Sequence, residues 1–346
     1  MRNTTLYGVA ATDTFRANSE GITVDFINKI KKGTNLQNIE KSMRRMYIPD
    51  DGKRFVQTDQ AGAEAKIVAY LCRDGNFRAL FDNNIKPHVF VALHLFSQIW
   101  EKKLNEFAGD IKLNISEVLE TPIPQLRSHR QWKELDKLIK LSDNWSAAER
   151  YYYIGKQVCH SSNYDAGVNM FRMNTLEKSR GKVVISKQEG EKYMTFYHSL
   201  FPEIREMHRE IRSIVEKTRT LYNLFGFPRY FGRELDERYF KAAYAFIPQS
   251  TVGCITHIAY TKMQEFIESN KLDWDLLANT HDSYLLQCSA NEALECARVS
   301  KAFMEQKLIS PAGVEFQMGA EVSIGDNWGP YKKGTNEDGL QEVQLN

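Results

Sequence analysis

The sequence predicts a mixed α+β fold, and three observations indicate it. A short β-prone run over 54–58 ends at Asp59 and passes through small residues into 67–71, where apolar side chains have the spacing of one helical face. Two strand-like runs flank the polar dipeptide at 281–282, as in a β-hairpin. The region 183–220 has a helical pattern, so helices and antiparallel strands are both expected.

Two carboxylates occupy special places in these elements. Asp59 lies where a strand leads into a helix, and a simple helix cap is the ordinary interpretation of such a residue. Asp282 would lie at the tip of the hairpin. If the fold brings the two carboxylates together, they form a site for two hard divalent cations.

Composition limits the class of protein. A chain of 346 residues with 42% hydrophobic content buries a sizeable core and is long enough for two or three subdomains. The net charge is +2, so a groove for nucleic acid must come from the arrangement of charges. The 5 cysteines include no Cys-x-x-Cys pair, which favours reduced thiols and disfavours a zinc site. With no signal peptide and no long apolar run, we expect a cytoplasmic protein that contacts no membrane.

The order of several short motifs resembles a known family. Arg16 stands in a T-x-R-x-x-S setting, Asn38 in N-L-Q-N-I, Asp59 is followed by Glu64, and 324–328 read I-G-D-N-W. This order resembles the polymerase domain of family A DNA polymerases, the group of bacterial DNA polymerase I and many phage replicases. The resemblance covers nearly the whole chain. It implies a palm, an antiparallel sheet backed by helices, with helical fingers, and it implies that Arg16 and Asn38 contact DNA.

The resemblance also implies a division of the chain. Residues 1–88 would form an N-terminal arm and the first part of the palm, 89–225 the fingers, and 226–346 the remainder of the palm. Within the fingers, 96–145 is longer than the family requires. We expect an elaboration without chemistry there, with a contact to DNA or to a partner protein as the alternative. The nucleotide-binding helix would span 146–166, and Ser146 and Glu149 form a capping box at its start.

The first family motif reads D-Y-S-Q-I-E-L-R or D-A-S-G-L-E-L-R, where this chain has D-Q-A-G-A-E-A-K. Asp59, Gly62 and Glu64 match, and Lys66 replaces an arginine. By resemblance Asp59 is a metal ligand, and Glu64 crowds the 2′ position of the sugar and so excludes ribonucleotides. The alternative for Glu64 is a solvated helix residue.

Four residues resemble the nucleotide-binding set of the fingers. Lys156, His160 and Tyr164 fall at i, i+4 and i+8 and share one helical face, as in the family pattern K-x-x-x-F-x-x-x-Y. Lys156 would neutralise the triphosphate and donate a proton to pyrophosphate, His160 would stack, and Tyr164 would pack beneath the templating pair. His88 matches the histidine of D-I-H-x-x-x-A, a triphosphate contact, although a structural histidine is the alternative.

One positively charged residue of the family's nucleotide-binding set is not at the expected position in this chain. The family has an arginine four residues before the lysine, where this chain has Tyr152. Arg150 lies two residues earlier and is the candidate for the γ-phosphate.

Two further residues resemble DNA contacts. Arg229 is the surviving cation of a segment similar to F-G-R-R-R-Y and suits a phosphate contact that carries no sequence information. Gln249 matches the glutamine of P-x-Q-G, which reaches the minor groove at the primer terminus. Minor-groove acceptors are nearly alike in all correct pairs, so this contact checks pairing geometry. The family asparagine four residues earlier is Ala245 here.

The last motif departs from the family, which reads H-D-E where this chain reads His281-Asp282-Ser283. Asp282 is expected to be the second metal ligand and His281 to lie near the primer 3′ end. Ser283 removes a carboxylate, and His-Asp-Ser is the sequence of single-subunit RNA polymerases. Glu64 disfavours that alternative, because the resemblance implies a small residue facing the sugar in RNA polymerases.

Together these residues predict a DNA-directed DNA polymerase, a nucleotidyltransferase. Two Mg²⁺ ions, or Mn²⁺ as a substitute, would be held by Asp59 and Asp282 at roughly 3.5–4 Å from each other. The primer 3′-hydroxyl would then attack the α-phosphorus of a dNTP paired with the template. No covalent enzyme intermediate is needed.

The partners expected are primer-template DNA and dNTPs. In the family a helical thumb, and often a 3′–5′ exonuclease domain, precede the T-x-R segment, and few residues do so here. We therefore expect a split polymerase whose thumb and exonuclease lie on a second polypeptide, with a distributive minimal enzyme as the alternative. The divergent motifs favour a phage-encoded protein of the bacterial cytoplasm. A non-catalytic, DNA-binding replisome subunit is the alternative from another class.

Overall fold

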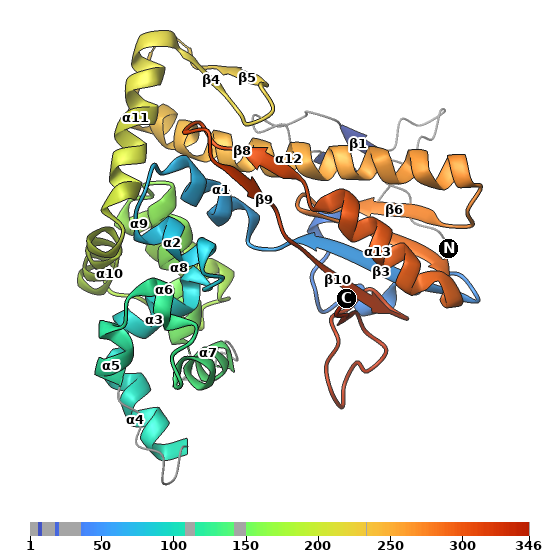
Figure 1. The fold of residues 1–346 in the computed structure, drawn as a ribbon, viewed down its shortest axis with the longest axis horizontal. Helices are drawn as coiled ribbons and strands as arrows, with labels where there is room; N and C mark the ends of the chain where they lie inside the picture. Colours follow the sequence, from blue (N-terminus) through green and yellow to red (C-terminus); the bar gives the residue numbers. More distant parts are fainter. Residues whose placement is uncertain are drawn as a thin grey trace. The chain divides into compact units, whose positions relative to one another are not determined.

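An antiparallel sheet with strand order β11-β10-β3-β7-β6 forms the centre of the part of the chain that carries both carboxylates (Figure 1). Its strands are β3 (Lys53–Gln60), β6 (Asp275–Asn279), β7 (Ser283–Ser289), β10 (Ala320–Gly325) and β11 (Gln341–Glu342). The computed structural model describes residues 6–8, 18–20, 36–107, 115–141, 150–232 and 234–345. The predicted α+β class is confirmed, because this sheet is combined with many helices.

The chain divides into two compact units. The first contains Met1–Ile67, Leu221–Arg229 and Phe246–Asn346, and the second contains Val68–Thr220 and Tyr230–Ala245. The assignment of these units to palm and fingers stays a prediction.

One face of the sheet is covered by helices α12 (Glu237–Asn270) and α13 (Ala293–Met304). Side chains alternate along β3, and Val56, Thr58 and Gln60 are buried on this side. The Gln60 amide donates to the Val252 carbonyl at 3.0 Å, and the Thr58 hydroxyl contacts that of Ser300 on α13. The intervening residues of β3, among them Gln57 and Asp59, therefore face the opposite side of the sheet.

That opposite face carries its own apolar cluster, composed of Leu36, Phe55, Ala278, Leu285 and Trp328. The short helices η1 (Leu36–Asn38) and η2 (Arg44–Met46) belong to the segment that leads into β3. Tyr47, which follows η2, lies edge-on to the ring of Trp328 with 5.8 Å between centroids. Segments from both ends of the chain thus cover part of the face on which Asp59 lies.

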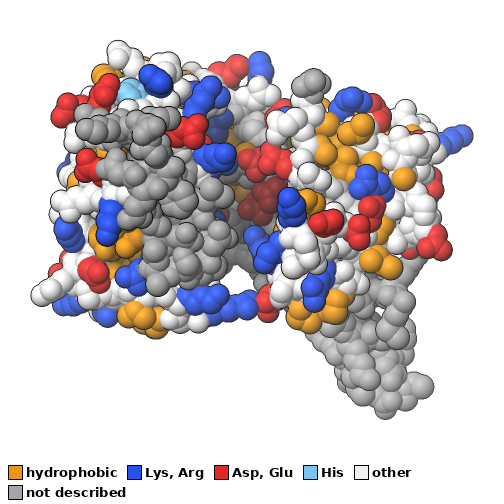
Figure 2. Space-filling model, turned by 90° about the horizontal axis from the view of Figure 1, so that it is seen from below, with side chains coloured by type: hydrophobic (Ala, Val, Ile, Leu, Met, Phe, Trp, Pro, Cys, Tyr) orange, Lys and Arg blue, Asp and Glu red, His pale blue; other side chains and the backbone are white. Residues whose placement is uncertain are grey.

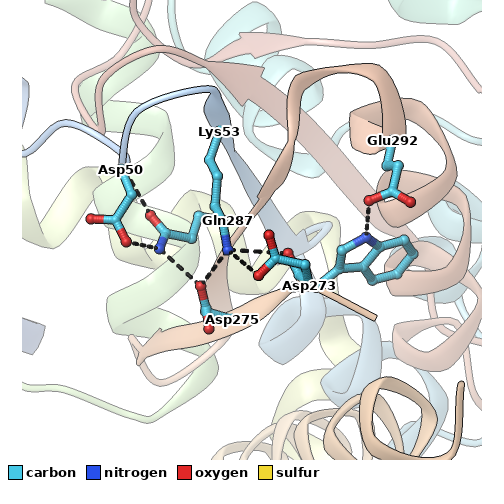
Figure 3. Close-up of polar contacts among 7 residues, drawn as sticks. Asp50, Lys53, Asp273, Asp275, Gln287 and Glu292 are labelled. Atoms are coloured by element: carbon cyan, nitrogen blue, oxygen red, sulfur yellow. Dashed lines mark hydrogen bonds and ion pairs between the residues drawn. The ribbon is translucent and has the colours of Figure 1, made fainter. Parts of the chain in front are cut away.

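The end of β3 distant from Asp59 is held by an ion-pair network (Figure 3). The Lys53 ammonium contacts Asp273 at 2.8 Å and Asp275 at 2.9 Å. The amide of Gln287 donates to Asp50 at 2.8 Å and to Asp275 at 2.9 Å. These contacts join β3, β6 and β7 and help to fix the register that determines what lies opposite Asp59.

The second unit is helical. It contains α2 (Asn76–Asp82), α3 (Pro87–Leu95), α4 (Ser97–Phe107), α5 (Ile115–Glu120), α6 (Ile123–Leu126), α7 (Trp132–Leu141), α8 (Tyr151–Asn163), α9 (Val168–Lys178), α10 (Lys187–Leu200) and α11 (Pro202–Thr218). Pro202 opens α11, as predicted, because a helix start needs no N–H at that position. Residues 142–149 lie outside the described ranges, so the capping box at 146–149 stays a prediction.

The segment 96–145, predicted to be an elaboration, contains α4 to α7. Trp100 on α4 is fully buried and donates its indole N–H to the Ala92 carbonyl at 2.9 Å. Leu135 and Ile139 on α7 are also buried, so this segment packs as part of the helical unit. Among the helices described, none is long and apolar enough to cross a membrane.

The remaining regular elements are short. Helix α1 (Ala63–Leu71) follows β3. The described residues also form two-stranded pairs of β1 (Leu6–Gly8) with β2 (Asn18–Glu20), β4 (Thr220–Tyr222) with β5 (Pro228–Tyr230), and β8 (Lys307–Ile309) with β9 (Glu315–Gln317).

Candidate active site

Asp59 lies near the end of β3, just before the turn into α1. Gly62 in that turn has φ +58°, the left-handed conformation that glycine adopts without steric cost. Helix α1 begins at Ala63, so Glu64 lies in its first turn and is partly accessible. The strand-to-helix junction predicted from the sequence is therefore present, with Asp59 inside the strand instead of capping the helix.

Asp282 lies at the tip of the hairpin formed by β6 and β7, as predicted. The turn is closed by two backbone bonds, from Asp282 N to the Thr280 carbonyl at 3.0 Å and from Thr280 N to the Ser283 carbonyl at 2.7 Å. The backbone N–H of Gln60 donates to the Asp282 carbonyl at 3.0 Å. This bond joins the hairpin tip to the end of β3, so the structure brings Asp59 and Asp282 to the same place.

The surroundings of Asp59 disfavour the negatively charged form of its carboxyl group. The pKa of Asp59 is raised to about 7; burial contributes most to this rise, the negative charges of Asp282 and Glu321 add to it, and the positive charges of Lys41 and Arg44 oppose it. Glu321 is directly opposite Asp59 on β10. A buried carboxylate beside two others is stabilised by a cation. The site therefore favours bound positive charge.

The donor set fits Mg²⁺. Within the described residues, no three His, Cys, Asp or Glu side chains converge closely enough to enclose a metal ion. Mg²⁺ does not require such a cage, because it keeps several waters and binds through one or two carboxylates plus substrate phosphates. Asp59 and Asp282 would supply the two hard oxygen donors that this mode needs.

Ser283 does not supply a third ligand. Its side chain is 2% exposed, and its hydroxyl contacts the hydroxyl of Thr280 and lies 3.5 Å from the Gln57 amide nitrogen. The hydroxyl is thus turned into the protein. The third acidic residue near Asp59 is Glu321, which sequence reasoning missed, although the alternation of β10 was a signal for a residue on that face.

His281 has a strained backbone at the hairpin tip. Its φ is +72°, a conformation that costs a non-glycine residue roughly 1–2 kcal/mol. Its N–H donates to the Asn279 side chain at 3.1 Å. Strain of this kind often accompanies a functional residue.

We predict that His281→Gly unfolds at a higher temperature than His281→Ala, because glycine relieves the strain that alanine keeps. Both variants lack the imidazole and are expected to lose primer extension equally. Thermal unfolding and extension rates measured on the same preparations test this prediction. Equal activity of both variants and the wild type would contradict a role for the imidazole.

In the second unit, α8 carries two of the three residues that the sequence placed on one helical face. Lys156 and His160 are exposed, and Tyr164 follows the last residue of the helix. The rings of His160 and Tyr164 meet edge to face with 5.3 Å between centroids. Lys156 and His160 therefore lie on an exposed surface of α8, and Tyr164, partly accessible, lies just beyond the end of the helix.

His88 on α3 lies beside this face. Helices α3 and α8 approach closely at Gly155, where a Cβ atom would lie 3.0 Å from the His88 carbonyl oxygen. The centroids of the His88 and Tyr152 rings are 6.3 Å apart. The pKa of His88 is lowered to about 3, chiefly by burial and in addition by the positive charges of Lys156 and His160. His88 is thus a neutral hydrogen-bonding group at pH 7.

Arg150 immediately precedes α8 and interacts electrostatically with Glu189 and Tyr193 of α10. Its side chain therefore lies toward α10. The Nε atom is buried and has no hydrogen-bond partner among the residues described. Its role at the γ-phosphate stays a prediction.

The structure describes three of the four residues discussed here that were predicted to contact DNA. Arg229 has its guanidinium carbon 5.8 Å from the centroid of the Phe246 ring, and Gln249 is a partly accessible residue of α12. Asn38 is the last residue of η1, and Arg16 lies outside the described residues.

The sequence matches a protein-family model and two curated proteins. The model for DNA polymerase family A matches residues 149–330, and the chain belongs to this family. The chain is 22% identical over 310 residues to DNA polymerase I of Borreliella burgdorferi, covering 85% of this chain and 28% of that protein. It is 19% identical over 306 residues to DNA polymerase I of Caldicellulosiruptor bescii, covering 85% and 29%. The chain thus spans less than a third of the length of these relatives.

A solved structure has the same fold. It is the POL domain of Pol1 from M. smegmatis in complex with DNA primer-template and dNTP. Its TM-score is 0.64 at 19% identity, over 94% of this chain and 47% of that one. The resemblance to family A polymerase domains inferred from the sequence is therefore confirmed.

Proposed function

We propose that the protein is a template-directed DNA polymerase that extends a primer 3′-hydroxyl with dNTPs and uses two Mg²⁺ ions. The observation that carries the proposal is that the hydrogen bond from the Gln60 N–H to the Asp282 carbonyl places Asp282 beside the end of β3, where Asp59 lies. The chain also belongs to family A. The M. smegmatis protein of the same fold is in complex with primer-template and dNTP, which supports the same ligands here.

The chemistry follows from the side chains. Mg²⁺, when bound, would lower the pKa of the primer hydroxyl and neutralise the triphosphate. Asp59 and Asp282 hold that charge. The primer hydroxyl loses its proton to solvent water, and its oxygen bonds to the α-phosphorus as the bond from phosphorus to the bridging oxygen breaks. Lys156 gives the bridging oxygen a proton as pyrophosphate leaves. His88, neutral at pH 7, donates a hydrogen bond to a phosphate oxygen.

Contacts to DNA would come from individual cations. The face drawn in Figure 2 shows Lys and Arg side chains interspersed with Asp and Glu side chains, in agreement with the net charge of +2. Arg229 and Gln249 are the contacts we propose in the first unit. A second polypeptide that supplies a thumb or an exonuclease stays a prediction.

A primed-template assay with Mg²⁺ tests the function. We expect extension with dNTPs, little with NTPs, and none without a primer. Binding of the DNA without extension would favour the non-catalytic alternative, which is consistent with serine at position 283 in place of the family's glutamate. Synthesis from NTPs without a primer would identify an RNA polymerase.

We predict that Glu64→Ala raises ribonucleotide incorporation roughly 10-fold or more, because removing a side chain that crowds the 2′ position relaxes steric exclusion. The ratio of incorporation rates for one dNTP and its NTP measures the effect. Glu295→Ala, an exposed glutamate on α13, is the matched control. An unchanged ratio in Glu64→Ala would show that Glu64 is a surface residue only.

A further inference from the structure

A cavity of about 210 Å³ opens beside Asp59, on the sheet face that carries Gln57. The lining residues used below are Lys41, Arg44, Gln57, Asp59, Glu321 and Trp328. All of them belong to the first unit. The roles given to Asp59 and Asp282 do not account for this cavity or for its two cations.

Arg44 is held in one position at this cavity. Its guanidinium carbon lies 4.6 Å from the centroid of the Trp328 ring, and its Nε donates to the Ile39 carbonyl at 3.2 Å. With one face and Nε engaged in this way, the terminal Nη groups are the donors that remain for a ligand.

Trp328 is itself fixed, so the plane on which Arg44 lies is rigid. The indole N–H donates to the Gln57 side-chain oxygen at 2.8 Å, and the backbone N–H donates to the Tyr47 carbonyl at 3.0 Å. The Trp328 side chain is 2% exposed. A planar guanidinium held on such a surface loses little entropy when it binds an anion.

The charges around Arg44 explain which anion it would bind, and when. Asp59 and Glu321 line the same cavity, and Asp59 and Asp282 interact with Arg44 electrostatically. Without metal these carboxylates repel an anion. Cations held by Asp59 and Asp282 would reverse the local charge, and Arg44 with Lys41 would then attract a phosphate.

We propose that Arg44, held on Trp328, binds a phosphate group of the polymerase substrates beside Asp59. This inference rests on the proposed function. A guanidinium forms two parallel hydrogen bonds to a phosphate, which positions it without reading sequence. The phosphate belongs either to the backbone of the primer strand or to the incoming nucleotide, and the experiment separates these two sources.

The experiment compares Arg44→Ala with Arg45→Ala. Arg45 is the next residue of η2, is exposed, and does not line the cavity, so it is a matched control. A fluorescent primer-template with a chain-terminated primer is titrated with each protein in Mg²⁺ at several salt concentrations, and anisotropy reports binding. The corresponding dNTP is then titrated into the preformed complex.

If the primer strand supplies the phosphate, Arg44→Ala binds DNA roughly 10-fold more weakly, as expected for one charged hydrogen-bonded contact. The slope of log affinity against log salt falls in magnitude by about 0.9. If the nucleotide supplies it, DNA binding is retained and dNTP affinity falls by a similar factor. Arg45→Ala behaves as the wild type in both titrations.

Arg44→Lys keeps the charge and provides a second variant if Arg44→Ala does not fold. It is expected to restore the salt slope and only part of the affinity, because an ammonium forms no paired bonds. Equal behaviour of the Arg44 and Arg45 variants in both titrations overturns the inference. The inference is also overturned if Arg44→Ala changes only the shift in melting temperature that Mg²⁺ induces. That result would show that Arg44 acts only as a counterion of the carboxylates. A wild type that binds no primer-template overturns the proposed function as well.

Discussion

The Asp59→Asn and Asp282→Asn variants are each expected to extend a primed template roughly 10³-fold more slowly than the wild type, equivalent to about 4 kcal/mol of transition-state stabilisation. Asparagine keeps the size of the side chain and removes the charge that would hold Mg²⁺. DNA affinity should stay within a few fold, because phosphate contacts elsewhere hold the duplex. Single-turnover extension and anisotropy titrations measure the two quantities separately.

Asp273→Asn is the matched control for these variants. Asp273 pairs with Lys53 at 2.8 Å at the other end of β3, and its side chain is 75% exposed. In this variant Lys53 keeps its ion pair with Asp275 at 2.9 Å, so the contacts that join the strands are retained and primers should be extended at nearly the wild-type rate. Near-normal extension by both Asp59→Asn and Asp282→Asn would refute the assignment of the metal ligands.

Stability provides an independent readout for Asp59. Burial raises the pKa of this carboxyl to about 7 from the usual 3.8, so the folded state holds its proton more tightly than the unfolded state. The free energy of unfolding therefore falls as the pH rises from the pKa of Asp59 in the unfolded state to its pKa in the folded state. Above the folded-state pKa the loss is complete. In metal-free buffer Asp59→Asn should melt at a higher temperature than the wild type at pH 8, and at the same temperature near pH 4. A lower melting temperature at pH 8 would show that Asp59 stabilises the fold.

Local patterns in the sequence predicted the elements that carry the candidate site. The apolar spacing after Asp59, the polar dipeptide between strand-like runs and the helical spacing of Lys156, His160 and Tyr164 are all short-range signals, and each element is present in the structure. The family resemblance added the order of these elements, and the fold agrees with it. Roles of individual residues are not tested by these agreements.

Contacts between distant segments were not predictable in the same way. Glu321 is opposite Asp59 because β10 pairs with β3, and a shift of one residue in that register would turn it to the other face. The contact of Arg44 with Trp328 joins residues from opposite ends of the chain. In the sequence Trp328 is part of a terminal motif, and no periodicity indicates which side chain lies on its ring.

Departures from the family are explained in part by packing. Ser283, where the family has a glutamate, is buried with its hydroxyl against Thr280, so its environment suits a small polar side chain. Tyr152, where the family has an arginine, lies beside the neutral ring of His88. The structure gives no explanation for His160 in place of an aromatic residue.

Lys156→Ala is the second change for which we expect a large effect. The lysine is exposed on α8, one turn before His160, and its charge lowers the pKa of His88. We expect kcat for dNTP incorporation to fall roughly 10²–10³-fold, because a proton donor and a preorganised charge are lost together. The dNTP concentration at half-maximal rate should rise as well, since that charge also holds the bound triphosphate.

Two further variants separate the contributions of Lys156. Lys156→Arg keeps the positive charge and does not release a proton at neutral pH, so it should recover nucleotide affinity and leave kcat low. Lys192→Ala, an exposed lysine on α10, should match the wild type. Identical kinetics for Lys156→Ala and Lys192→Ala would remove Lys156 from the reaction, and the face of α8 would then serve packing or DNA contact alone.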